Sequence, residues 1–214
     1  VAGERYAPAN KAQAESTGVQ IVQQHLNLIG TLNIAENLFL GDLPARVGWI
    51  DRARLAEDAR AVLARVGLDG IDPATPVGDL GVGTQQLIEI AAALAHECRL
   101  LILDEPTAAL TDAEADVLFK RVRELSGDGV AVLYVSHRLE EVRALCDRWT
   151  VLRDGRRVAS GAMSQVDDAQ ILALMAGEEV EVASLAGEEP LGARDARAEP
   201  IVGQGRAEEI LFEV

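Results

Sequence analysis

Short aliphatic runs alternate with amphipathic segments along most of this chain, and the runs predict strands. The clearest run is Leu-Leu-Ile-Leu at residues 100–103, and a second covers residues 130–135. A short unbroken apolar run is typical of a strand buried on both faces, as in a parallel sheet covered by helices. Residues 19–23 are β-like, and residues 149–159, with a turn at Asp154 and Gly155, predict a β-hairpin.

The amphipathic segments predict helices with identifiable starts. Asp51 caps one helix, and Thr111 with Glu114 three residues later forms a capping box at another. An Ala/Leu/Ile-rich helix is expected over about residues 85–97, and a last one opens at Asp167 or Asp168. Alternating strands and helices with short connections predict an α/β domain around a mostly parallel sheet. Residues 27–95, nearly all helix and loop, are expected to form a helical insertion.

Composition narrows the class of protein. The chain has 214 residues, 49% of them hydrophobic, which is enough for a substantial core. Its formal net charge of −15 argues against nucleic acid or anionic lipid recognised by bulk electrostatics. Residues 177–214 are strongly acidic, and no apolar run approaches the roughly 20 residues needed to cross a bilayer. Cys98 and Cys146 are predicted to be buried free thiols.

Polar side chains follow three predicted strands at their carboxyl ends. Gln24 follows the first strand, Asp104 and Glu105 the second, and His137 the third. Ligands of open α/β sheets bind at this edge, so the two carboxylates are candidates for holding a divalent metal and activating a water molecule. Taken singly, each has an ordinary alternative: the acids could start a polar turn, and the histidine could be a satisfied surface or core residue.

A turn containing Gly81 and Gly83 precedes the 85–97 helix. The backbone N–H groups and the positive dipole end of such a helix start make it a ready anion site. An ordinary loop remains the alternative for this turn on its own.

In their order and spacing these features resemble the ATP-binding-cassette (ABC) transporter ATPases, in particular the twin-cassette subunits of ribose/galactose/xylose-type sugar importers. Residues 24–29 and 34–41 are similar to the Q-loop segment, 78–91 to the signature region, 101–111 to Walker B with the D-loop, and 134–138 to the H-switch. The resemblance covers residues 6–176. It implies a P-loop NTPase-like α/β fold with a mostly parallel sheet and a helical insertion subdomain.

The resemblance also implies ATP and Mg²⁺ as cofactors and suggests a role for each site residue. Asp104 would hold Mg²⁺, mostly through water, and Glu105 would polarise the attacking water. Gln24 would reach the metal and the water, and His137 would contact the γ-phosphate or link Glu105 to it. Asp112 would sit at a dimer seam. The turn that clamps the ATP of an opposing cassette would consist of Leu80, Gly81, Val82, Gly83, Thr84 and Gln85.

Two departures from the family pattern matter. No G-x-x-x-x-G-K-[ST] loop occurs in the chain, and the resemblance puts that phosphate-binding loop upstream of Val1. Residues 1–176 are therefore expected to be an N-terminally truncated nucleotide-binding domain, with residues 27–95 as its helical subdomain. Residues 177–214 would be an acidic linker and the start of a truncated second domain. The second departure is Gly81 in place of the signature serine, which removes a hydrogen bond worth roughly 1.5–3 kcal/mol to a charged phosphate.

The expected function is that of the ATP-hydrolysing subunit of a sugar importer, with very weak or no hydrolysis by the 214 residues alone. Expected partners are a membrane permease, a second ATP-binding cassette in cis or in a homodimer and, indirectly, a periplasmic sugar-binding protein, with no nucleic acid. The expected location is peripheral, on the cytoplasmic face of the inner membrane. One alternative is a non-catalytic module that docks on a permease or another partner. A DNA-repair or chromosome-organising ATPase is disfavoured by the acidic charge.

Overall fold

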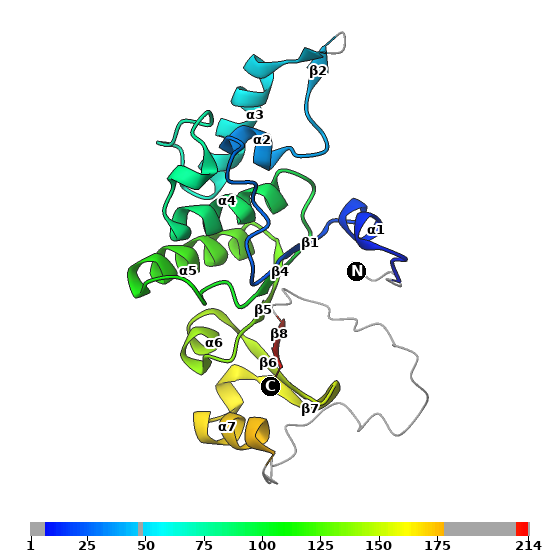
Figure 1. The fold of residues 1–214 in the computed structure, drawn as a ribbon. Helices are drawn as coiled ribbons and strands as arrows, with labels where there is room; N and C mark the ends of the chain where they lie inside the picture. The colour runs from blue at the N-terminus through cyan, green and yellow to red at the C-terminus, as the bar shows by residue number, and fades with distance from the viewer. Residues whose placement is uncertain (1–6, 47–48, 178–208, 214) are drawn as a thin grey trace.

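The computed structural model describes residues 7–46, 49–177 and 209–213, and its centre is a six-stranded sheet (Figure 1). Five strands lie parallel, and the sixth is an antiparallel edge strand. In spatial order they are β1 (Val19–Val22), β4 (Leu100–Asp104), β5 (Ala131–Val135), β8 (Glu209–Glu213), β6 (Arg148–Arg153) and β7 (Arg156–Ala162). The predicted mostly parallel α/β sheet and the β6–β7 hairpin are confirmed.

Helices α5 (Asp112–Gly127), α6 (Leu139–Leu145) and α7 (Asp168–Ala176) lie along one side of the sheet, and α1 (Lys11–Ser16) lies on the other side of β1 (Figure 1). A short 3₁₀ turn, η2 (Met163–Gln165), precedes α7. Leu101 and Leu103 of β4 are fully buried, whereas Leu100 and Ile102 alternate with them and are only half-buried. The prediction of burial on both faces is therefore wrong for β4, because α5 to α7 gather on one side.

Residues 34–94, called here the helical region, extend from the β1 end of the sheet (Figure 1). They contain α2 (Ile34–Leu38), the hairpin of β2 (Ala45–Arg46) and β3 (Trp49–Ile50), α3 (Arg52–Arg65), η1 (Val77–Asp79) and α4 (Val82–Leu94). Leu38, Leu63 and Ile88 belong to the same core cluster as Leu101 and Leu103 of the sheet. Burial of this continuous apolar core fixes the helical region against the strands that carry the candidate site.

Side-chain caps begin three of the helices at the predicted residues. Asp51 accepts from the Arg54 N–H at the start of α3, and capping boxes open α5 at Thr111 and α7 at Asp167. Helix α4 differs, since it begins at Val82 instead of near residue 85. Gly81 is its N-cap in extended geometry, and the Gly81 carbonyl accepts the first helical bond from Gln85 at 3.0 Å. The low helix propensity of glycine hid this early start from sequence reasoning.

Most of the predicted linker, residues 177–214, lies outside the described residues, but β8 within it pairs in parallel with both β5 and β6. The domain boundaries near residue 176 stay predictions. Cys98 and Cys146 are half-buried and form no disulfide, and burial raises the pKa of the Cys98 thiol to about 11. Across the described residues, no helix combines the length and hydropathy needed to span a membrane.

Candidate functional site

Three adjacent parallel strands deliver the candidate catalytic side chains to one edge of the sheet. Strand β1 pairs with β4 so that Val22 lies opposite Leu103, and β4 pairs with β5 so that Asp104 lies opposite Val135. Gln24, Glu105 and His137 all follow within two residues of these strand ends. The pairing register therefore brings residues that are far apart in the sequence to the same place.

The Glu105 carboxylate is the centre of this group. Its Oε2 accepts a hydrogen bond from Gln24 Nε2 at 3.0 Å, and its Oε1 lies 2.8 Å from His137 Nδ1. The Glu105 side chain is 27% exposed and the His137 side chain 61%, so the pair is accessible from solvent. We call Gln24, Glu105 and His137 the catalytic-edge cluster. A carboxylate bonded on both oxygens is held in one orientation while it remains able to accept a proton from water.

The backbone of Glu105 is also unusual. Its φ is +44°, a left-handed conformation that costs a non-glycine residue roughly 1–2 kcal/mol. The Glu105 N–H donates to the Val135 carbonyl at 2.9 Å, and the Glu105 carbonyl accepts from the Ala108 N–H at 3.2 Å. These two bonds hold the turn that follows β4. Strained residues that persist in this way cluster at active sites, which agrees with the position of Glu105.

Asp104 is the last residue of β4 and is half-buried. The described residues contain no cluster of three or more His, Cys, Asp or Glu that could hold a metal ion. Mg²⁺ needs no such cluster, because it keeps several waters and takes only one or two carboxylates. Asp104 beside Glu105 therefore fits a hydrated Mg²⁺. The oxygen of the Gln24 amide is a second group that could bind the ion.

The second candidate region is the turn around Gly81, here called the signature turn (residues 80–85). Gly81 and Val82 are exposed, Gly83 is buried, and Leu80, Thr84 and Gln85 are half-buried. The Gln85 Nε2 donates to the carbonyls of Val77 at 3.1 Å and Leu80 at 2.8 Å. The Gln85 side chain thus closes the turn internally and does not present a donor to a ligand. What the turn offers at the surface is the backbone at the N-terminus of α4.

Glu114 of α5 lies directly against this helix start. A Cβ added at Gly83 would lie 2.4 Å from the Glu114 Oε1, so any other residue there would require the Glu114 side chain to move. Hydrogen bonds from the backbone and side chain of Thr111, and a weaker one from the Gly83 backbone, lower the pKa of Glu114. Asp112, which the sequence predicts at a dimer seam, is the first residue of α5 and is exposed. Sequence reasoning recognised Glu114 only as a helix cap.

Glu89 of α4 joins the signature helix to the segment after Gln24. Its Oε1 accepts from the Asn27 backbone N–H and from Asn27 Nδ2, both at 3.3 Å. Glu89 is buried, and in the described part of the chain its Oε2 has no hydrogen-bond partner. Burial raises the pKa of Glu89, although its bonds to Asn27 oppose that shift.

Glu141 of α6 is a further buried carboxylate next to the catalytic-edge cluster. It accepts hydrogen bonds from the hydroxyls of Thr107 at 2.7 Å, Tyr134 at 2.8 Å and Ser136 at 2.9 Å. The Arg138 guanidinium lies 2.9 Å from the Glu141 Oε1, the oxygen that also accepts from Thr107. Sequence reasoning missed this residue, because Glu140 and Glu141 look alike on a short helix and only the structure separates the exposed one from the buried one.

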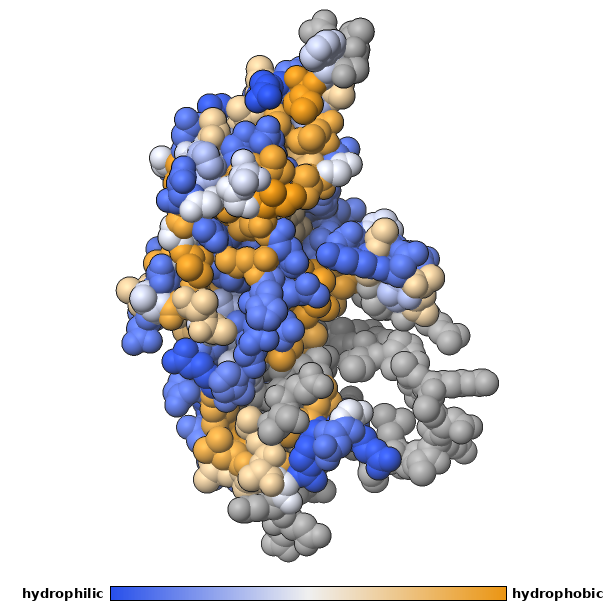
Figure 2. All heavy atoms as spheres, in the orientation of Figure 1, coloured by the Kyte–Doolittle hydropathy of each residue, from blue (hydrophilic) through white to orange (hydrophobic). Residues whose placement is uncertain are grey.

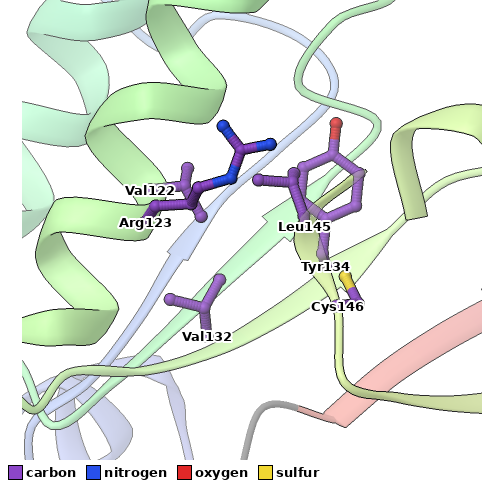
Figure 3. Close-up of a pocket in the computed structure, with 6 residues that line it drawn as sticks. All are labelled: Val122, Arg123, Val132, Tyr134, Leu145 and Cys146. Carbon is purple, nitrogen blue, oxygen red and sulfur yellow. The ribbon is translucent and has the colours of Figure 1, made fainter. Parts of the chain in front are cut away.

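Figure 3 shows a small pocket behind β5, between α5 and α6. The Tyr134 ring and the Cys146 sulfur lie at one side of it, and the Arg123 side chain reaches across from α5. Arg123 donates to the Ala144 carbonyl at 2.8 Å, and the Tyr134 ring meets Phe119 edge-on. Its walls are mostly apolar and none of the predicted site residues lines it. We therefore treat it as a packing gap and not as the site.

Comparison with solved structures defines the fold class first. The chain aligns with MJ1267, an ATP-binding cassette of an ABC transporter in its ADP conformation, with a TM-score of 0.62 and 23% identity over 78% of this chain and 71% of that one. A nucleotide-free ATP-binding cassette from an ABC transporter gives a TM-score of 0.63 and 24% identity over 83% and 72% of the two chains. The fold is that of an ATP-binding cassette, as the sequence predicted.

The sequence comparisons then give the family. A family model described as "ABC transporter" matches residues 2–108. The "Ribose import ATP-binding protein RbsA" of Chromobacterium violaceum is 46% identical over 185 residues, covering 84% of this chain and 37% of the relative. "Ribose import ATP-binding protein RbsA 3" of Rubrobacter xylanophilus is 44% identical over 180 residues, covering 84% and 36%. The chain belongs to the ABC transporter family, and it spans about a third of the length of these curated relatives.

Proposed function

We propose that the protein carrying this sequence is the ATP-binding subunit of a sugar importer, which hydrolyses ATP to drive carbohydrate transport. The observation that carries the proposal is the Glu105 carboxylate, bonded at once by Gln24 and His137 from two neighbouring strand ends. The names of the related ribose import ATP-binding proteins support the transport role. A non-catalytic docking module would have no need for this arrangement of an acid, an amide and an imidazole.

The residues of the catalytic-edge cluster would share the work of orienting water. Glu105 would accept a hydrogen bond from the attacking water and polarise it, while Gln24 holds one carboxylate oxygen. His137 would hold the other oxygen and contact the γ-phosphate from its exposed face. Phosphoryl transfer depends mainly on positioning and on charge stabilisation, so three fixed side chains suffice for this part of the reaction.

ATP with Mg²⁺ would be the substrate and the metal of this site. Asp104, with the Gln24 amide oxygen, would hold the ion largely through its water shell. When bound, Mg²⁺ neutralises charge on the phosphate oxygens. The 214 residues contain no G-x-x-x-x-G-K-[ST] loop, and we therefore expect them to hydrolyse ATP very weakly by themselves.

The signature turn would act on a second cassette. The exposed backbone at Gly81 and Val82 and the helix start behind it would bind the γ-phosphate of an ATP held opposite, with Asp112 at the seam. The second cassette would belong to the same protein or to a second copy. The helical region would dock on a membrane permease at the cytoplasmic face of the membrane. A periplasmic sugar-binding protein would take part indirectly.

Substitution of Glu105 by glutamine tests the catalytic assignment. In the protein that carries this sequence, Glu105→Gln should lower kcat for Mg-ATP by roughly 10²- to 10⁴-fold, because the amide cannot take up a proton. The KM should change little, since the nucleotide contacts remain. Glu97→Gln, an exposed change outside the helical region, is the matched control and should leave kcat unaltered. Ordinary turnover by Glu105→Gln would refute the assigned role.

A further inference from the structure

Glu141 connects the two loops that carry Glu105 and His137. Thr107, two residues after Glu105, donates to Glu141 Oε1 at 2.7 Å. Ser136, the residue before His137, donates to Glu141 Oε2 at 2.9 Å. Thr107, Ser136 and Glu141 are each only 3% exposed, so these bonds are shielded from water. One carboxylate therefore fixes the polypeptide on both sides of the His137–Glu105 contact.

The Glu141 carboxylate is buried and has hydrogen-bond or ion-pair partners on both oxygens. Burying a carboxylate is costly unless donors satisfy both of its oxygens. Here three hydroxyl groups and the Arg138 guanidinium supply those donors. Burial and the neighbouring charge of Glu141 raise the pKa of Tyr134, so its hydroxyl remains a neutral donor. A single charge thus holds several donors from three elements together.

The loop after β5 has a second bond that depends on this arrangement. The Arg138 N–H donates a hydrogen bond to Ser136 Oγ at 3.0 Å, and the Ser136 hydroxyl in turn donates a hydrogen bond to Glu141. Because His137 lies between Ser136 and Arg138, its backbone is fixed at both neighbours. His137 Nδ1 lies 2.8 Å from Glu105 Oε1, and both residues lie within two positions of a residue bonded to Glu141.

We propose that Glu141 is a positioning residue, which sets the contact between His137 and Glu105 without touching nucleotide or water. The proposal rests on the proposed ATP hydrolysis at Glu105, and it makes a separate claim about the two loops that is measurable without turnover. Glu141→Gln keeps the size of the side chain but replaces the carboxylate by a neutral amide. The amide N–H₂ group would face hydroxyls that donate to Glu141 in the unmodified protein. Glu140→Gln, one residue earlier and exposed, is the matched control.

Amide hydrogen exchange of the protein that carries this sequence tests the mechanical claim. Glu141→Gln should raise exchange about tenfold in both residues 105–108 and residues 138–141, and Glu140→Gln should raise it in neither. Unchanged exchange, or a change in only one of the two segments, would overturn the proposal. Should Glu141→Gln fail to fold, Thr107→Val and Ser136→Ala each remove one arm. Each variant should raise amide exchange in its own segment. Unchanged exchange in both variants would also contradict the proposal.

Turnover measurements test the link to catalysis. Glu141→Gln should lower kcat by about 10- to 100-fold with little change in KM, as a misplaced catalytic pair does. Combined with His137→Ala, it should cause no loss beyond that of His137→Ala alone, because both changes break the same contact. A multiplicative loss would indicate a general structural role and contradict the proposal. If the unmodified protein shows no ATP turnover, the proposed function fails and the exchange data alone decide the role of Glu141.

Discussion

The catalytic-edge cluster and the signature turn both contain polar side chains, but they use them in different ways. In the cluster, polar side chains meet one another: Glu105 is bonded by Gln24 and by His137. In the signature turn the polar side chain of Gln85 closes back on Val77 and Leu80, and the backbone is left at the surface. The first region is assembled by contacts within this chain. The second presents N–H groups and a helix dipole outward.

The difference shows what positions each region. The cluster depends on strand register, since a one-residue slip of β1 against β4 would move Gln24 away from Glu105. The signature turn depends on where α4 begins and on Glu114, which packs against Gly83. Hydrogen bonds between Asn27 and Glu89 connect the two regions, so a movement of one region can displace the other.

The largest effect expected in the signature turn comes from restoring the family's serine. Gly81→Ser should tighten ATP-dependent association of cassettes, because the hydroxyl adds one hydrogen bond to a charged phosphate, worth roughly 1.5–3 kcal/mol, or about 10- to 150-fold. The site accepts the change, since nothing lies within 4 Å of a Cβ at Gly81 and its φ is −63°. Association is measured by light scattering against ATP concentration in the Glu105→Gln background, where hydrolysis is slow.

The control for this gain is Gly70→Ser, an exposed glycine that also has nothing within 4 Å of its Cβ. It should leave association unaltered. Equal association for Gly81→Ser and the unmodified protein would mean that the turn does not face phosphate. The contrast between the two regions would then lose its functional meaning, although the geometry would stand.

The strand ends could be predicted from sequence because the pattern of apolar runs is local. The four aliphatics before Asp104 and the run before Ser136 identify two strands, and parallel pairing then brings Glu105 and His137 to one edge. The N-caps Asp51 and Thr111 could be predicted for the same reason, since a cap hydrogen-bonds within three residues of itself.

Other features depended on contacts that no local pattern encodes. The burial of Glu141 between Thr107 and Ser136 arises from three elements that pack together, and so does its difference from Glu140. The start of α4 at Val82 required Gly81 to act as an extended N-cap, which propensity alone disfavours. The link from Asn27 to Glu89 spans 62 residues and follows only from tertiary packing.

A smaller effect is expected when that link is broken. Asn27→Ala removes the Nδ2 donor to Glu89 and leaves the buried carboxylate with one hydrogen bond fewer, which should lower the free energy of unfolding by about 1–3 kcal/mol. The backbone N–H of residue 27 persists in the variant, so the lower part of this range is expected. Urea unfolding followed by circular dichroism measures the change.

Gln23→Ala is the matched control, because it removes the other contact of Asn27, a 3.2 Å bond at an exposed position. It should change the free energy of unfolding by no more than about 0.5 kcal/mol. If both variants are equally stable, the Asn27–Glu89 bond does not join the two regions in any energetic sense. Loss of stability in Asn27→Ala alone would establish that it does.

The smallest expected effect concerns how Glu89 responds to pH. Burial raises its pKa in the folded protein above the ordinary value of 4.5. As pH rises through that value the unfolded chain releases the Glu89 proton while the folded chain retains it, so this group makes folding less favourable until the folded pKa is passed. Glu89→Gln has no such proton. The stability of Glu89→Gln relative to the unmodified protein should therefore increase as the pH rises through 4.5 and stay level once the pH exceeds the raised pKa of the folded protein.

The difference in stability at one pH also contains the cost of the amide N–H₂ that replaces the partnerless Oε2, so its sign alone decides nothing. Its change with pH isolates the proton, because every other titrating group is common to both proteins. A constant difference for Glu89→Gln would mean that Glu89 keeps its ordinary solvation in the folded protein. The link between the signature helix and the segment after Gln24 would then be a surface contact instead of a buried one.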